Sequence, residues 1–330
     1  MKKILAMVLI IMLCCCGLIG CGTAEMDTTD KNVVIWTTEV DYVVDYYITA
    51  LKEKFPDYNI TIENVSSSTM PAKVIEEGEN CSCDILWTED YAYLLKCSDY
   101  LAELKDIDYS KFLDDTVPEN HKYTPEERYA GGVILNMDML AEWNLPEPKS
   151  YQDLLDPMYQ GLISMPNPAA SGTGYMFLRQ LVNEWGEDAA FDYFEKLAPN
   201  ILQFTSSGNG PVNALIQGEA AIGLGYISQA VQEINNGRNL KIVYFDEGVP
   251  FAIYGNALLK KSEKKQAAVD VFKYIAEELV YKNNELFYPE QIIKDFTPEV
   301  ENYPTDIPYG NMTNNTPEEK ERLLAKWTFS

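Results

Sequence analysis

The chain has 330 residues, of which 46% are hydrophobic, and its 51 Asp and Glu residues outnumber 26 Lys and Arg residues to give a formal net charge of −25 at pH 7. This length and apolar content allow about two domains with buried cores. The acidic balance, without a basic stripe, excludes nucleic acid and anionic membrane surfaces as partners. The single histidine, His121, lies in a polar segment outside any catalytic motif, so the sequence disfavours an exported enzyme.

The amino terminus has the pattern of an export signal. A basic start precedes an apolar run over 4–19, which is short for a membrane span. The run ends Leu-Ile-Gly-Cys, which resembles a bacterial lipobox and implies cleavage before Cys21 and a lipid on its sulfur. We expect 1–20 to be a lipoprotein signal peptide, with an ordinary secretory peptide as the alternative. The polar stretch that follows, to residue 32, is expected to be a tether (21–32). The protein is then exported and lipid-anchored to the outer face of the cell membrane, or to a periplasmic membrane face.

Three cysteines remain in the mature chain, at Cys81, Cys83 and Cys97. An odd number in an exported protein means either one disulfide and a free thiol, or no disulfide. Cys97 could pair with either of the other two. A metal site would need more ligands nearby, so we expect no metal and no cofactor.

The first part of the mature chain alternates strands and helices at the pitch of an α/β lobe with a parallel sheet. The predicted elements are strand 33–37, helix 41–55, strand 58–65, helix 71–77 and strand 84–87. In such sheets ligands bind beyond the carboxyl ends of the strands. The candidate binding residues at these ends are Thr37, Thr38, Ser67, Ser68, Trp87 and Thr88.

The remainder reads as a second α/β lobe. Residues 110–128 are polar and irregular, and 131–136 is a strand leaving the first lobe. The later predicted elements are helix 151–156, strand 162–165, helix 188–197, strand 200–204, helix 212–217, strand 218–226, strands 240–245 and 251–259, and helices 264–278 and 317–327. The strand that ends at Tyr226 and the turn that contains Ser207 again bring polar groups to strand ends.

The most informative stretch is 165–175, where a strand meets a helix through a proline-fixed turn. Ser171, Gly172 and Thr173 open that helix, which continues to about residue 184. The first N–H groups of a helix have no internal partner and carry the positive end of its dipole, so they can hold an anion. The alternative is that Ser171 serves only as an N-cap.

Several segments, in order along the mature chain, resemble extracellular solute-binding proteins of ABC importers, in the group that includes ferric-ion, 2-aminoethylphosphonate, hexose-phosphate and thiamine binders. The matching segments are 33–38, 84–87, 153–157, 165–175, 196–200, 218–226 and 247–248. The resemblance implies the type II periplasmic-binding-protein fold, with 33–132 and 247–295 in lobe 1 and 133–246 and 296–330 in lobe 2. It also implies a monomer whose partners are a permease, an ATPase and a solute held in a hinged cleft.

Within this resemblance the ligand stays open. Ferric binders carry adjacent tyrosines near the end of the strand corresponding to 218–226, because phenolates are hard ligands for Fe(III). This chain has one tyrosine there, Tyr226, with Tyr254 as a possible second ligand. We therefore favour a small anionic solute such as a phosphonate or phosphate ester, bound by neutral donors. Ferric iron or an iron chelate is the alternative, and a solute sensor without transport is an alternative of another class.

Overall fold

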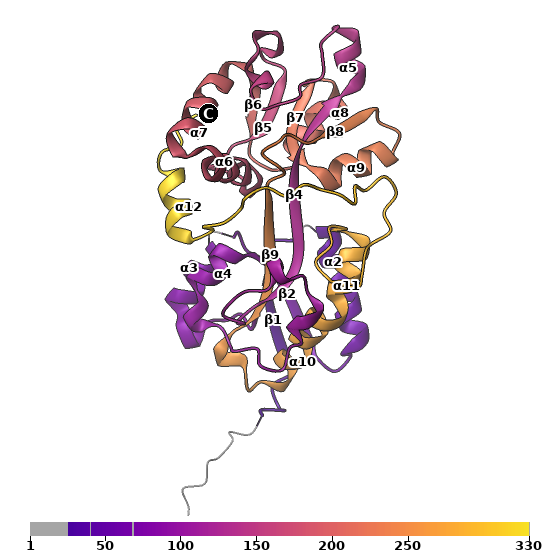
Figure 1. Ribbon diagram of the computed structural model, residues 1–330. Helices are drawn as coiled ribbons and strands as arrows, with labels where there is room; N and C mark the ends of the chain where they lie inside the picture. Colours follow the sequence, from indigo (N-terminus) through magenta and orange to yellow (C-terminus); the bar gives the residue numbers. More distant parts are fainter. Residues whose placement is uncertain (1–25, 40, 68, 330) are drawn as a thin grey trace, which may run out of the picture.

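The computed structural model describes residues 26–39, 41–67 and 69–329. Two α/β lobes lie end to end, and the strands β4 (Thr124–Asn136) and β9 (Phe251–Leu258) run through the centre between them (Figure 1). The strands follow the order β2-β1-β3-β9-β4-β7-β5-β6, and β8 also pairs with β4. The mixed α/β class predicted from the sequence is confirmed.

The first lobe, at the bottom of Figure 1, is built on a sheet in which β1 pairs in parallel with β2 and β3. Val43, Tyr47 and Leu51 of α2 recur every four residues and are buried, so this helix packs one apolar face against the sheet. Its elements are β1 (Asn32–Thr37), α2 (Asp41–Lys54), β2 (Asn59–Asn64), α3 (Thr69–Glu77), β3 (Ile85–Asp90), α4 (Tyr91–Lys96), α10 (Gln266–Tyr274) and α11 (Val280–Leu286).

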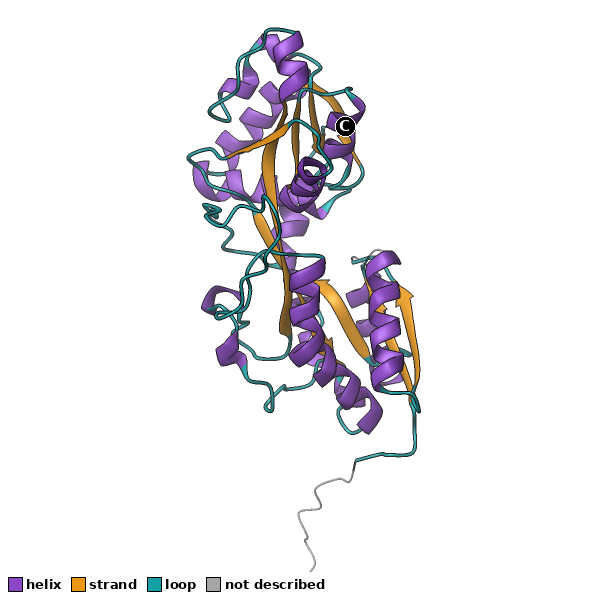
Figure 2. Cartoon of the chain, turned by 90° about the vertical axis from the view of Figure 1, so that its right-hand side faces the viewer, coloured by secondary structure: helices purple, strands orange, loops and turns teal. Residues whose placement is uncertain are grey.

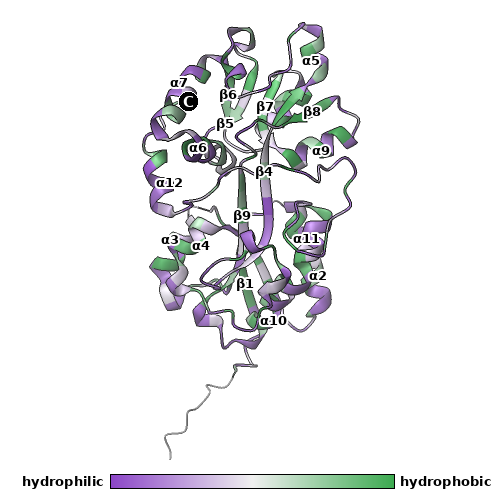
Figure 3. Cartoon of the chain, in the orientation of Figure 1, coloured by the Kyte–Doolittle hydropathy of each residue, from purple (hydrophilic) through white to green (hydrophobic). Residues whose placement is uncertain are grey.

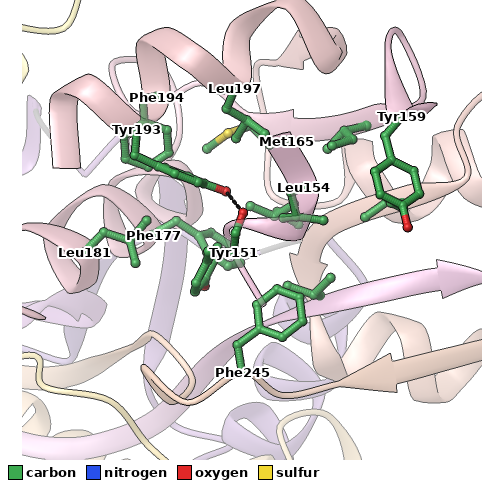
Figure 4. Packing of buried hydrophobic residues seen from close by; sticks show 14 of the residues in the cluster. Tyr151, Leu154, Tyr159, Met165, Phe177, Leu181, Tyr193, Phe194, Leu197 and Phe245 are labelled. Carbon is green, nitrogen blue, oxygen red and sulfur yellow. Dashed lines mark hydrogen bonds between the residues drawn. The ribbon is translucent and has the colours of Figure 1, made fainter. Parts of the chain in front are cut away.

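The second lobe contains the strands β5 to β8 and the core shown in Figure 4, where Tyr193 donates a hydrogen bond of 3.0 Å to the carbonyl of Tyr151. Figure 3 shows mostly hydrophobic residues on the strands of this lobe, whereas its outer helices carry both hydrophobic and hydrophilic residues. The elements are α5 (Met137–Glu142), β5 (Ile163–Pro166), α6 (Gly172–Trp185), α7 (Glu187–Leu197), β6 (Ile201–Thr205), α8 (Gly210–Gln217), β7 (Ile222–Tyr226), α9 (Ile227–Asn235) and β8 (Leu240–Val243).

The strand β4 belongs to both sheets. It pairs with β9 as far as Ala130 and with β7 from Gly131 onward. A methyl group on Gly131 would lie 2.9 Å from the ring of Phe177, so a residue without a side chain is needed where the strand passes α6. The exact boundaries of the two lobes stay a prediction.

The first half of β4 corrects the sequence analysis, which treated 110–128 as irregular. Residues 124–128 are strand, and Glu126, Glu127 and Arg128 in it are buried. Charged residues and a proline predict a loop locally, but here tertiary partners pair with the charged groups and the strand forms.

Other helices were missed or shortened by the sequence analysis. We predicted no helix at α4, α5 or α9, and we expected a helix at 264–278 where α10, a π-helical turn (Ile275–Leu279) and α11 continue to Leu286. In α9 the buried Ile227, Ala230 and Val231 show the spacing of one helix face, a signal that the sequence did contain.

The helix α12 (Pro317–Leu324) connects the lobes on one flank. Leu323 and Trp327 pack in the core of the second lobe. Lys320 lies 3.8 Å from Asp90, the N-cap of α4 in the first lobe, and its ammonium lies over the rings of Tyr93 and Tyr175. A second, exposed ion pair, between Lys96 of α4 and Glu321 of α12, joins the same two helices.

Two further findings concern the cysteines and the search for membrane-spanning helices in the described residues. Cys81, Cys83 and Cys97 are free and buried in a core cluster of the first lobe, so the alternative without a disulfide holds. Across the described residues we find no helix with the length and apolar character needed to cross a membrane. Cys21 and the predicted signal lie outside the described residues.

Candidate functional site

A cleft of about 760 Å³ lies between the two lobes. Figure 2 shows the two lobes one above the other, joined by long strands that run from one into the other. Tyrosines from β4, β9 and β7 line the inner end of the cleft. The lining residues are Thr38, Glu39, Tyr42, Ser67, Tyr129, Ser207, Gly208, Asn209, Tyr226, Ser228, Gln229, Val231, Gln232, Asn235, Asn236, Tyr254, Leu286, Phe287, Tyr288, Pro289, Val300 and Tyr303.

Five of the predicted binding residues line this cleft. They come from the end of β1, the loop after β2, the turn before α8, the end of β7 and the middle of β9: Thr38, Ser67, Ser207, Tyr226 and Tyr254. Segments far apart in the sequence therefore meet as expected for strand ends of two facing sheets. Ser68 lies outside the described residues.

Three other predicted residues lie outside the lining of the cleft. Thr37 is buried and accepts a hydrogen bond from the N–H of Glu39. Trp87 is fully buried and stacks on Tyr47 at 4.1 Å. Thr88 is buried in the left-handed region, with φ at 58°. Each of them supports the first lobe from within.

The predicted anion-binding stretch forms the start of α6, beside the cleft. Ser171 is buried and precedes the helix, yet its hydroxyl makes no capping hydrogen bond. In the described part of the chain, the N–H groups of Gly172, Thr173 and Gly174 also make no hydrogen bond. A methyl group placed on Gly172 would lie 3.2 Å from the hydroxyl of Tyr254, so this helix start adjoins the wall of the cleft.

Gly208 packs between the start of α6 and the ring of Tyr226. A methyl group on Gly208 would lie 2.1 Å from the hydroxyl of Thr173 and 2.5 Å from the ring of Tyr226. Thr173 itself is buried, and its hydroxyl lies close enough to Tyr226 to lower the pKa of that phenol, although burial raises it by more. Gly172 and Thr173 therefore lie directly behind residues that line the cleft, and Ser171 precedes them in the chain.

Four tyrosines pack together at the inner end of the cleft: Tyr129, Tyr226, Tyr254 and Tyr288, hereafter the tyrosine group. The ring of Tyr129 is at the centre, 5.3 Å from Tyr226, 5.0 Å from Tyr254 and 4.8 Å from Tyr288 between ring centroids. Burial raises the pKa of each of these phenols, so they are neutral hydrogen-bond donors at neutral pH.

Two glutamates lie against the tyrosine group. Glu39 lines the cleft, and it accepts hydrogen bonds from Tyr288 at 2.8 Å and from Tyr129 at 3.5 Å. Glu127 is fully buried and accepts from the amide of Asn283 at 3.0 Å. Burial, and then the charge of Glu39, raise the pKa of Glu127 well above its usual value.

Two more buried carboxyl groups support the hinge. Glu126 accepts from Tyr47, from Asn256 at 2.5 Å and from Trp87 at 3.5 Å. Glu290 accepts from the N–H of Ala130 at 2.7 Å and from the hydroxyls of Tyr303 and Tyr309 at 2.9 and 3.1 Å. Burial raises the pKa of each to about 7, and the hydrogen bonds lower it only in part.

The sequence analysis missed several residues of the cleft. Glu39 followed the candidate Thr38 directly, but we treated it as the end of a strand. Tyr129 and Tyr288 lie in segments to which we had assigned no binding role. The amide-rich face of α9, with Gln229, Gln232, Asn235 and Asn236, was missed together with its helix.

Comparison with known proteins agrees with this geometry. The family model of bacterial extracellular solute-binding proteins matches residues 95–301. An uncharacterized protein of Haemophilus influenzae is 27% identical over 94% of both chains. A putative 2-aminoethylphosphonate-binding periplasmic protein of Salmonella typhi is 27% identical over 56% of each chain.

Solved structures share the fold. The periplasmic binding protein AfuA of Actinobacillus pleuropneumoniae, with fructose-6-phosphate bound, matches with a TM-score of 0.76 at 23% identity, over 90% of this chain and 98% of that one. Iron-bound HitA of Pseudomonas aeruginosa matches with a TM-score of 0.76 at 18% identity, over 89% and 98%. The likeness to these structures shows the type II periplasmic-binding-protein fold.

The raised pKa values of Glu126 and Glu290 make folding stability depend on pH. In the unfolded chain a Glu titrates near 4.5, so the folded protein binds more protons from there up to about pH 7. Stability therefore falls as pH rises through this window, by roughly 3 kcal/mol for each group. We expect the free energy of unfolding in urea to be several kcal/mol lower at pH 8 than at pH 5.

The matched variant for this measurement is Glu126→Gln, which keeps the shape and an acceptor for Tyr47 and Trp87 but replaces the acceptor for Asn256 by an amide group. It should remove roughly 3 kcal/mol of the difference between pH 5 and pH 8. Asp30 and Glu187, whose pKa values are lowered to about 2, change protonation below this window and do not interfere. A stability that is flat or rises from pH 5 to pH 8 would contradict the assignment.

Proposed function

The chain belongs to the bacterial extracellular solute-binding proteins, and from this membership and the geometry of the cleft we propose that it captures a small anionic solute, a phosphonate or a phosphate ester. Members of this family deliver small solutes to the permease of an ABC importer. The proposed site is the start of α6 together with the hydroxyl groups that line the cleft beside it.

The observation that carries this proposal is the open start of α6. Within the described residues its first N–H groups have no acceptor and the hydroxyl of Ser171 makes no capping bond, and they lie near Tyr254 and Tyr226. An anion accepts from such donors, and the helix dipole adds to the attraction. The hydroxyls of Thr38 and Ser67 line the cleft but already donate to the carbonyl of Thr88 and to Glu89, so Ser207, Tyr226 and Tyr254 are the further neutral donors. A phosphoryl or phosphonyl group has enough oxygens to use several of them.

We also propose that the chain is exported and held at the membrane by a lipid on Cys21, as its amino-terminal pattern indicates. The chain in which Cys21 is replaced, Cys21→Ser, should lose labelling by radioactive palmitate and should no longer partition with membranes. Labelling that persists in this variant would contradict the proposed anchor.

A second candidate ligand is ferric iron, because the tyrosine group and Glu39 place several oxygen donors at one end of the cleft. Burial opposes it by raising the pKa values of the phenols of Tyr226 and Tyr254, which must lose their protons to bind Fe(III). We expect no visible phenolate-to-iron charge-transfer band when ferric citrate is added. A strong band that Tyr226→Phe abolishes would favour iron over the anionic solute.

The anion site is tested with Ser171→Ala and Thr173→Val. If Ser171 donates to a bound anion, its loss should weaken binding by about 1.5–3 kcal/mol, on the order of ten- to hundredfold in Kd. Because its hydroxyl makes no capping bond, the urea midpoint of the ligand-free protein should change little. The ligand is first found by a thermal-shift screen of phosphonates and phosphate esters, and the Kd is then measured by calorimetry.

The matched control is Thr316→Val at the start of α12, where the hydroxyl accepts from the N–H of Glu319 at 3.2 Å. Loss of this cap should lower stability by about 1 kcal/mol and leave the Kd unchanged. If Ser171→Ala and Thr173→Val behave like this control, the start of α6 is a structural turn and the proposed site is wrong.

A further inference from the structure

The cleft has the wrong charge for a ligand that is only an anion. Among the described residues that line it, Glu39 is the one charged side chain, and none is Lys, Arg or His. A buried carboxylate repels an anion across a medium of low dielectric constant. The open start of α6 explains the attraction of an anion, but it leaves the presence of Glu39 unexplained.

A second carboxyl group lies behind Glu39. Glu127 is fully buried, and the charge of each influences the other. The oxygen Oε2 of Glu127 accepts from Asn283, whereas Oε1 has no hydrogen-bond partner within residues 26–39, 41–67 and 69–329, although the hydroxyl of Tyr129 lies near enough to lower the pKa of Glu127. A buried acceptor without a donor is costly in a folded protein.

Aromatic rings surround this pair of carboxyl groups. Tyr129 and Tyr288, which donate to Glu39, pack edge to face at 4.8 Å, and both line the cleft. Tyr42 lies at the rim and is exposed, and its phenol is influenced by the charges of Glu39 and Glu127. Rings and carboxylates together are a favourable environment for an organic ammonium group, which gains from the faces of the rings as well as from the charges.

The carboxyl pair and the start of α6 lie on either side of Tyr254. Its hydroxyl adjoins Gly172, and its ring centroid is 5.0 Å from that of Tyr129. Tyr254 therefore lies between the start of α6 and the ring of Tyr129, which donates to Glu39. The donors at the start of α6 belong to the second lobe, whereas the acceptors Glu39 and Glu127 belong mainly to the first lobe.

We propose that Glu39 and Glu127, with the rings of Tyr129 and Tyr288, form an ammonium-binding subsite, so that the solute is a zwitterion carrying a protonated amine beside its phosphonyl or phosphoryl group. This inference rests on the proposed function for the anionic end of the solute. Glu39 contacts the amine directly, and Glu127 lies behind it, where a bound ammonium favours the ionised form of a carboxyl group whose pKa burial raises.

The test compares ligands that differ in one charge. The probes are 2-aminoethylphosphonate, n-propylphosphonate, in which a methyl group replaces the ammonium, and propylamine, which lacks the phosphonate. By calorimetry at pH 7 we expect the wild-type protein to bind 2-aminoethylphosphonate about 10–100-fold more tightly than n-propylphosphonate. Glu39→Gln and Glu127→Gln should each reduce this preference about tenfold or more, with the Kd for n-propylphosphonate changed by less than about threefold.

The control variant is Glu126→Gln, which removes a neighbouring buried carboxyl group of the same strand that faces Tyr47 and Asn256. It should keep the full preference for the amine. A loss of preference in Glu126→Gln equal to that in Glu39→Gln would overturn the subsite, because the effect would then come from net charge alone.

The remaining outcomes separate this inference from the function on which it rests. Equal affinity of the wild-type protein for 2-aminoethylphosphonate and n-propylphosphonate would overturn the ammonium subsite and leave the anion site standing. Binding of propylamine as tight as that of 2-aminoethylphosphonate would overturn the anionic solute and leave the subsite standing. Absence of binding of all three probes at millimolar concentration would overturn both.

Discussion

Buried carboxyl groups need donors, and this requirement organises the junction of the two lobes. Glu126 draws together donors from α2, β3 and β9, whereas Glu290 draws together the backbone of β4 and two tyrosines of the segment that leads to α12. An unpaired buried carboxyl group would cost several kcal/mol, so each donor is held where the carboxyl group needs it. The strand shared by the two sheets thereby has a fixed position relative to the first lobe, and the side chains that it presents to the cleft are held with it.

In contrast to these carboxyl groups, polar groups on both walls of the cleft lack hydrogen-bond partners among the described residues. Among the described residues, the hydroxyl of Ser171 makes no capping bond and one oxygen of Glu127 has no donor, whereas both carboxyl oxygens of Glu126 and of Glu290 accept hydrogen bonds. Unsatisfied groups at a binding site are tolerated when a ligand completes them, and the open cleft lets water do so in the meantime. The difference between a satisfied hinge and an unsatisfied cleft supports the view that the cleft holds a solute with matching groups.

Local sequence patterns predicted the regular strands and turns, but they failed for segments whose structure depends on contacts with distant residues. Buried β-branched runs gave β1 and β3, and the prolines and glycines around Ser171 predicted the open turn into α6. In contrast, Glu126, Glu127 and Arg128 follow a proline and look like a loop, because their partners Tyr47, Asn256 and Asp115 lie far away in the sequence or in another segment. Glu39 was passed over for the same reason. A carboxylate at the end of a strand is ordinary by itself, and only the packing of Tyr129 and Tyr288 against it marks it as part of a site.

The distribution of donors and acceptors over the two lobes links recognition to movement. The proposed anion-binding donors lie at the start of α6 in the second lobe, and Glu39 follows β1 in the first lobe. A solute that carries both charges contacts both lobes, so its binding free energy favours the arrangement in which the two walls are one solute apart. A solute that carries only the anion is held by one lobe and favours no particular separation. In the proposed scheme the second charge of the solute therefore contributes to selectivity twice, once through the contact with Glu39 and once through closure of the cleft around it.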